Sequence, residues 1–238
     1  TSFHGWQIQP NAATVQQQVD AALSVVFRQK VETLGCGRTD AGVHATQFFA
    51  HFDLSNVPAE TVNISLSNIN ALLPYTIAAK RIINVKADAH ARFDATERSY
   101  AYFIHFKKDP FKINRSWLFK EKLDVSAMNK AAELLKGYTD FSAFSKSNTQ
   151  TFTNNCRITN ACCIQDEEGI VFTISADRFL RNMVRAIVGT LVLIGKNEIA
   201  PEGMSTIVES MDRSNAGQSV PACGLFLVNV KYPYITDK

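Results

Sequence analysis

The sequence lacks a long apolar run, a secretory signal and any large excess of charge. Within its 238 residues, no hydrophobic stretch approaches the roughly 20 residues that a membrane-spanning helix needs. The first residues also lack the basic, apolar and small-residue pattern of a signal peptide. These absences predict a cytoplasmic protein rather than a membrane or secreted one.

Paired cysteine motifs are also missing. The five cysteines are an odd number, and none belongs to a Cys-x-x-Cys pair. No histidine lies at zinc-finger spacing from them. We therefore expect free, mostly buried thiols. Cys36, four residues before Asp40, is expected to be a small packed side chain rather than a nucleophile.

The net charge is only +3, which neither excludes nor requires a nucleic-acid partner. Hydrophobic residues make up 46% of the chain and charged residues 20%, the proportions of an ordinary globular protein. A chain of this length forms one large domain or two small ones around a sizeable core.

Hydrophobic periodicity predicts two successive α+β units. The first is expected in the order strand, helix, strand, strand, helix, strand, which is a ferredoxin-like arrangement. A capping box at residues 14–17 and Pro58 mark the starts of its two helices. The expected strands are 3–10, 31–34, 45–52 and 77–85, and the expected helices are 15–28 and 58–73.

The second unit is predicted to begin near residue 88. Its polar segment 138–155 is expected to be a long loop, a type that is uncommon unless it is functional or mobile. The expected strands are 92–95, 99–106, 157–164, 170–176 and 225–232, and the expected helices are 126–136, 179–194 and 204–211.

The most specific stretch is Gly37 to Ala45, with the sequence GRTDAGVHA. Arg38 and Asp40 are two residues apart, so an extended segment would place a cation and an anion on one face. Taken alone, Asp beside Gly is ordinary turn chemistry. His44 suggests a metal ligand, but one His and one Asp are too few, and a hydrogen bond that orders the loop is favoured.

These nine residues resemble the catalytic loop of the tRNA pseudouridine synthase A family. Further stretches match that family in the same order, from Gly5 to Pro233. Two positions depart from its pattern, Arg181 and Phe226, where a neutral residue and Tyr are usual. The matching stretches include Gly5-Trp6-Gln7, Asn70–Pro74, His90–Ala95, Arg98–Tyr102, Phe179–Arg185, Val188–Gly189, Pro221–Ala222 and Gly224–Leu227.

The resemblance implies an α+β pseudouridine synthase fold, in which two ferredoxin-like units form a continuous, mainly antiparallel sheet with a central cleft. Residues 1–87 would be an RNA-binding domain that carries the catalytic loop, and residues 88–238 would complete the cleft. A homodimer is also implied, with one tRNA touching both subunits. The chemistry needs no metal and no redox cofactor.

The implied activity is isomerisation of uridine to pseudouridine at positions 38, 39 and 40 of the tRNA anticodon stem-loop. Asp40 would be the nucleophile, and an unperturbed Asp, with a pKa near roughly 4, is ionised at neutral pH. Arg185 would pair with Asp40 and keep it anionic, unless it forms a surface salt bridge elsewhere. Tyr100 would lie against the flipped uracil and accept or relay the C5 proton, unless it is a core tyrosine.

Other residues are expected to hold the RNA. Arg38 would fill the gap left by the flipped nucleotide or hold its phosphate, because flipping costs a few kcal/mol. Thr39 of the same loop would contact the substrate. Leu225 or Leu227 would pack on the base, although either could simply belong to the core.

Two groups of cations are candidate phosphate contacts. Arg178, Arg181 and Arg185 fall at i, i+3 and i+7, which is one face of a helix. A second patch, equally well explained as solvated lysines in a turn, comprises Lys107, Lys108, Lys112 and Arg115. Because phosphate contacts carry no sequence information, recognition is expected to be mainly of tRNA shape.

Two other functions are considered. A tRNA-binding or RNA-chaperone protein with this fold and no turnover is disfavoured by the intact Asp40, Tyr100 and Arg185. A carboxylate-pair hydrolase is disfavoured because glycosidases need two opposed carboxyl groups, and Asp40 has no acidic neighbour in sequence nearer than Glu32 and Asp53.

Overall fold

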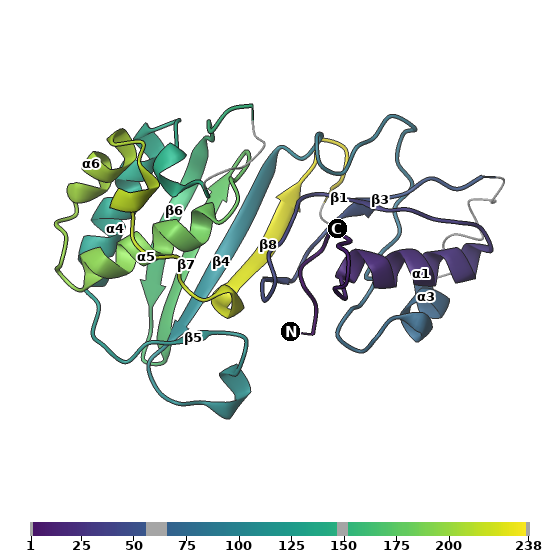
Figure 1. Cartoon of the computed structure of the whole chain (residues 1–238), viewed down its shortest axis with the longest axis horizontal. Helices are drawn as coiled ribbons and strands as arrows, with labels where there is room; N and C mark the ends of the chain where they lie inside the picture. The colour runs from purple at the N-terminus through teal and green to yellow at the C-terminus, as the bar shows by residue number, and fades with distance from the viewer. Residues whose placement is uncertain (1, 56–65, 147–151, 237–238) are drawn as a thin grey trace. The chain divides into compact units, whose positions relative to one another are not determined.

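The computed structural model describes residues 2–55, 66–146 and 152–236. The chain divides into two compact units (Figure 1). The first contains residues 1–42 and 48–95, and the second contains residues 43–47 and 96–238. The chain therefore crosses between units two residues after Asp40. The first unit extends beyond the predicted division at residue 87, and the assignment of functional domains stays a prediction.

In its described residues, the first unit contains a two-stranded antiparallel sheet and the helices α1 and α3. Strand β1 (Leu34–Gly35) pairs with β3 (Ala50–His51), and helix α1 (Val15–Phe27) packs with α3 (Leu66–Leu72). The Thr14 hydroxyl accepts from the Gln17 amide, so the predicted helix start is confirmed. The small core of this unit comprises Ala22, Leu23, Phe27, Val31, Ile69 and Leu73.

Several strands expected in this unit are short or absent. Residues 3–10 form no ladder, because the Gly5 and Trp6 carbonyls accept from the Val15 and Gln16 amides at the start of α1. Residues 77–85 also lie outside any strand. In this segment the Ala79 backbone exchanges two hydrogen bonds with the side chain of Asn70 on α3. Residues 92–93 form a turn and Asp94 a bend, so the strand expected at 92–95 is absent. The predicted helix start at Pro58 lies outside the described residues.

The second unit is built on a mostly antiparallel sheet in the order β2-β8-β4-β7-β6, with β5 beside β4. The pairs β4–β7, β6–β7 and β4–β8 are antiparallel, whereas β2–β8 and β4–β5 are parallel. The predicted hairpin at 157–176 is confirmed by the pair β6–β7. The strands are β2 (His44–Ala45), β4 (Glu97–His105), β5 (Trp117–Leu118), β6 (Ile158–Gln165), β7 (Gly169–Ala176) and β8 (Leu225–Lys231).

Helices α4 and α5 pack together against this sheet, and α6 packs on α4 (Figure 1). Alternate residues of β7, from Ile170 to Ala176, are buried in the same core as α4 and α5. None of the helices in the described ranges has the length and apolarity needed to cross a membrane. The helices are α4 (Val125–Leu134), α5 (Met183–Gly195) and α6 (Gly203–Glu209), with 3-10 turns at Pro110–Lys112, Leu135–Gly137, Ser142–Phe144, Arg213–Asn215 and Ala222–Gly224.

Helix α5 begins four residues later than the periodicity predicts. Asn182 has φ 67°, a left-handed conformation that a helix cannot contain, so the helix starts at Met183. Arg178 and Arg181 therefore precede the helix, and only Arg185 belongs to it. The prediction that the three arginines share one helix face is wrong.

The cysteines are free, as expected. Cys36, Cys156 and Cys163 are buried, and burial raises the pKa of the last two thiols to about 12. Cys162 and Cys223 are half-buried. Thiol reagents are therefore expected to reach Cys162 and Cys223 first.

Gly189 is where α5 meets the segment 217–220 most closely. A Cβ at Gly189 would lie 1.8 Å from the Gln218 carbonyl oxygen, and the neighbouring Thr190 hydroxyl accepts from the Gly217 amide. We expect Gly189→Ala to lower the free energy of unfolding by about 3 kcal/mol, measured by urea denaturation. Gly137→Ala is the control, since nothing lies within 4 Å of its added Cβ. If Gly189→Ala and Gly137→Ala were equally stable, the close approach of Gly189 to the Gln218 carbonyl would be contradicted.

Candidate active site

The loop that carries Asp40 follows strand β1, and a backbone hydrogen bond fixes its first residues. Cys36 is fully buried and its amide donates to the Phe49 carbonyl at 2.8 Å, next to the β1–β3 pair. Residues 38–40 then run without regular structure into a turn at Ala41–Gly42, where Gly42 has φ 83°. Arg38 is exposed, whereas Thr39 and Asp40 are half-buried.

The N-terminal segment packs directly behind this loop. Gly5 has φ 83°, and a Cβ added to it would lie 2.1 Å from the Thr39 carbonyl oxygen. The next residue, Trp6, is buried, and its ring centroid lies 4.3 Å from that of Phe48. Gly5 thus sets the position of the peptide that joins Thr39 to Asp40. The sequence placed Gly5 in a family motif but did not predict this role.

Residues after the loop are anchored in the second unit. Strand β2 pairs in parallel with β8, with His44 opposite Phe226. The His44 ring stacks on Phe226 at 4.5 Å between centroids, and its Nε2 donates to the Asn114 carbonyl at 2.6 Å. The expected loop-ordering hydrogen bond is confirmed. Burial lowers the pKa of His44. No cluster of three potential metal ligands occurs among the described residues.

Tyr100 lies on β4, in the middle of the second unit's sheet. It is half-buried, faces Ile174 on β7 and Leu227 on β8, and packs against the helix-covered core. A register shift separates it from Ser99 on the β8 side. Its ring meets Phe179 edge to face, with centroids 5.2 Å apart. The sheet and the chain before α5 therefore fix the orientation of this phenol.

Arg185 occupies the first turn of α5 and is bonded to the segment before β8. Its Nε donates to the Val220 carbonyl at 2.7 Å, and the Val220 amide donates to the Arg185 carbonyl at 3.3 Å. The Tyr102 hydroxyl donates to the next carbonyl, that of Pro221, at 2.8 Å. Burial raises the pKa of Tyr102, so this donor keeps its proton. The hydrogen bond from Nε therefore fixes the orientation of the Arg185 guanidinium group.

The sequence did not predict the residues that hold this segment. The Asn182 side chain donates to the Ser219 hydroxyl, and Arg213 Nη2 donates to the same oxygen at 3.0 Å. Asn182 was part of the family motif, and its tolerance of left-handed backbone was the available signal. Ser219 carries no local signal, because its partners lie 37 and 6 residues away.

The remaining candidates differ in exposure. Leu225 and Leu227 are only 6% and 2% exposed, which places both in the core, as the sequence allowed. Arg178 is half-buried and Arg181 is exposed. Within the second patch, Lys112 binds Glu168 at 2.7 Å, and its neighbours Lys107, Lys108 and Arg115 are exposed.

The candidates fall into two groups. Arg38, Thr39 and Asp40 belong to the first unit, whereas the other candidates, Tyr100 and Arg185 among them, belong to the second. Within the second unit, β4 positions the Tyr100 phenol, and the first turn of α5 positions the Arg185 guanidinium. The meeting of the two groups in one site stays a prediction.

Comparisons with known proteins agree with the motifs. A family model for tRNA pseudouridine synthase matches residues 131–233. The chain is 49% identical to tRNA pseudouridine synthase A of Parabacteroides distasonis, over 98% of this chain and 92% of that protein. For tRNA pseudouridine synthase A of Porphyromonas gingivalis the identity is 50%, over 98% of this chain and 93% of that protein. For tRNA pseudouridine synthase A of Clostridium acetobutylicum the identity is 37%, over 98% of this chain and 95% of that protein. The chain therefore belongs to the tRNA pseudouridine synthase A family.

Proposed function

We infer that this chain is an isomerase that converts uridine to pseudouridine in tRNA. The observation that carries this conclusion is the 49% identity to a tRNA pseudouridine synthase A over 98% of this chain. The GRTDAGVHA loop belongs to this chain. The backbone on either side of Asp40 is held in place. The Cys36 amide bonds the Phe49 carbonyl before the loop, and Gly5 packs against the Thr39 carbonyl.

The proposed sites of modification are positions 38, 39 and 40 of the anticodon stem-loop. The isomerisation breaks the bond between ribose C1′ and uracil N1 and forms a bond between C1′ and C5. The C5 proton leaves and N1 gains a proton, so the substrate and the product have the same composition. No oxidant or reductant takes part in this balance.

Asp40 is proposed as the nucleophile. Addition of its carboxylate to C1′ and addition to the uracil ring both begin from the ionised form. Arg185 is proposed to keep Asp40 anionic and to orient it, because a guanidinium can bind a carboxylate through charge-assisted hydrogen bonds. The bond from its Nε to the Val220 carbonyl fixes the orientation of this group. Tyr100 is proposed to lie against the flipped uracil and to accept or relay the C5 proton.

Arg38, Thr39, Arg178 and Arg181 are proposed RNA contacts. Exposure of Arg38 and Arg181 supports this assignment, since a cation that binds phosphate must be reachable. Leu225 and Leu227 are proposed to border the base, with Leu227 directly opposite Tyr100 on the neighbouring strand.

The larger arrangement is also proposed from the family. Two ferredoxin-like units would form one continuous sheet with a central cleft, with residues 1–87 and 88–238 as the two domains. Two copies of the chain would form a homodimer in the cytoplasm and bind one tRNA together.

The test is release of tritium from unmodified tRNA labelled at uridine C5. We expect one tritium to be released for each pseudouridine formed, and carbodiimide adducts read by primer extension to map the product to positions 38–40. Product elsewhere would contradict the position assignment. Tight tRNA binding without tritium release would instead favour the RNA-chaperone alternative.

A further inference from the structure

The segment 213–221 is hydrogen-bonded along the first half of α5. The Gly217 amide donates to the Thr190 hydroxyl at 2.9 Å, near the middle of the helix. Two residues later, the Ser219 hydroxyl accepts from the side chain of Asn182, which directly precedes the helix. The segment therefore runs back along α5 to its first turn, and none of its side chains belongs to the proposed site.

Val220 connects this segment to the guanidinium of Arg185. Its carbonyl accepts from Arg185 Nε at 2.7 Å, and its amide donates to the Arg185 carbonyl at 3.3 Å. The Val220 side chain is buried in the core of the second unit. Because a guanidinium is planar and rigid, the bond at Nε sets the direction of its two outer nitrogens. The direction of these nitrogens therefore depends on where the Val220 peptide lies.

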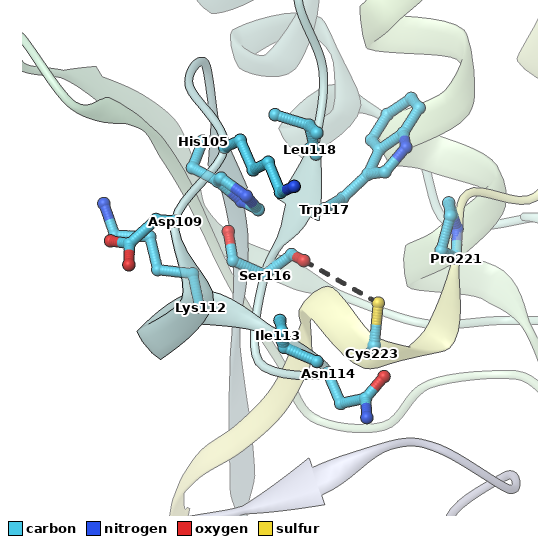
Figure 2. Close-up of a pocket in the computed structure, with 11 residues that line it drawn as sticks. His105, Asp109, Lys112, Ile113, Asn114, Ser116, Trp117, Leu118, Pro221 and Cys223 are labelled. Carbon is cyan, nitrogen blue, oxygen red and sulfur yellow. Dashed lines mark hydrogen bonds between the residues drawn. The ribbon is translucent and has the colours of Figure 1, made fainter.

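The residues after Val220 are fixed by the sheet. The Tyr102 hydroxyl on β4 donates to the Pro221 carbonyl at 2.8 Å. Figure 2 shows the next anchor, the Cys223 thiol, which donates to the Ser116 carbonyl at 3.8 Å. The proline ring also restricts the backbone of the residue before it. The C-terminal side of the Val220 peptide is thus held, and its remaining freedom depends on the residue that precedes it.

Ser219 holds the N-terminal side of that peptide through its side chain. Its hydroxyl oxygen accepts from Asn182 Nδ2 and from Arg213 Nη2, the second at 3.0 Å. A serine oxygen has two acceptor positions, so one atom satisfies both donors. Arg213 Nη1 also donates to the Ala216 carbonyl at 3.2 Å. The Ser219 oxygen therefore joins the start of α5 to the start of the segment.

We propose that Ser219 is a positioning residue for the isomerisation. Its hydroxyl keeps the Val220 carbonyl in place, and that carbonyl holds Arg185 Nε. The guanidinium thereby keeps the orientation that its proposed pairing with Asp40 requires. Ser219 acts through Arg185 and makes no contact with the RNA in this account. The inference rests on the proposed function, in which Arg185 keeps Asp40 anionic.

Ser219→Ala removes the shared acceptor. We expect kcat for tritium release to fall about tenfold, because a small displacement of a catalytic group is costly, with KM for tRNA within about twofold of wild type. Ser219→Thr keeps the hydroxyl and should restore most of kcat. Gln218→Ala is the matched control, since this neighbouring side chain is exposed, and it should keep the wild-type kcat and KM.

A double-mutant cycle tests whether Ser219 acts through Arg185. Arg185→Lys lacks the guanidinium Nε, so the bond that orients this group is absent from that background. Adding Ser219→Ala to Arg185→Lys should therefore lower kcat by less than about twofold. A further loss as large as in the wild-type background would give Ser219 a role independent of Arg185 and overturn the inference.

A third measurement reports the guanidinium without turnover. In a proton–nitrogen correlation spectrum, the Nε–H signal of Arg185 is identified by its loss in Arg185→Lys. Its exchange with water should be slow in the wild type, because this proton is bonded to the Val220 carbonyl. We expect Ser219→Ala to speed this exchange about tenfold, whereas Gln218→Ala should leave it unchanged.

The outcomes separate this inference from the proposed function. Wild-type kcat and unchanged Nε–H exchange in Ser219→Ala would overturn the inference and leave the isomerase function standing. A loss of kcat with unchanged exchange would also overturn it. Faster exchange in a chain whose wild type forms no pseudouridine would support the orienting bond and refute the isomerase function. If Ser219→Ala does not fold by circular dichroism, Arg213→Lys makes the same test, since an ammonium lacks the planar fork that bonds Ser219.

Discussion

Asp40→Asn is expected to lower kcat for tritium release by at least about a thousandfold. The amide has nearly the same shape as the carboxylate but has no negative charge and is a poor nucleophile. The loop itself should persist, because its anchors are the Cys36 amide, the Gly5 backbone and the β2–β8 pair. The loss should therefore appear in kcat, with tRNA affinity in a filter-binding assay within about threefold of wild type.

Asp53→Asn is the control, since Asp53 is an exposed carboxylate in the same unit outside the loop. It should keep the wild-type rate. If Asp40→Asn also released tritium at that rate, Asp40 would not be the nucleophile. A parallel loss of tRNA binding and thermal stability would instead show that the side chain supports the loop.

Local signals explain which elements were predicted correctly. Helix α1 was predicted because the Thr14 cap and its apolar spacing act within one turn. The β6–β7 hairpin was predicted because alternation and the acidic turn lie in one continuous stretch. Helix α5 was predicted with the wrong start, since one residue in left-handed backbone at Asn182 outweighed the apolar spacing before it.

Long-range contacts explain what could not be predicted. Residues 3–10 alternate like a strand, but their carbonyls bond to the start of α1 rather than to another strand. The short strand β5 pairs in parallel with the end of β4, and a sequence pattern does not reveal this pairing. The Asp40 loop was found because nine residues resemble a known family, whereas its support by Gly5 depends on a contact 34 positions away.

Gly5→Ala is expected to lower kcat about a hundredfold, because a misplacement of roughly 1 Å at the reacting groups costs about that much. The added Cβ would lie 2.1 Å from the Thr39 carbonyl oxygen, so the Thr39–Asp40 peptide must move. Loss of the φ 83° conformation adds a backbone cost of about 1 kcal/mol. Because the Thr39 oxygen belongs to the backbone, we expect a loss of unfolding free energy of about 3 kcal/mol, as for Gly189→Ala. Tritium release, measured well below the unfolding temperature, should show the hundredfold loss in kcat.

Two further variants separate the causes of that effect. Gly5→Asn tolerates left-handed backbone but keeps the Cβ, so it should be nearly as slow as Gly5→Ala if the contact with Thr39 dominates. A wild-type rate for Gly5→Asn would assign the effect to backbone conformation alone. Ser2→Ala, an exposed change in the same segment, should leave kcat unaltered. Because Gly5 touches the loop only through backbone atoms, a kcat loss confined to the Gly5 variants would show that catalysis depends on where this peptide lies.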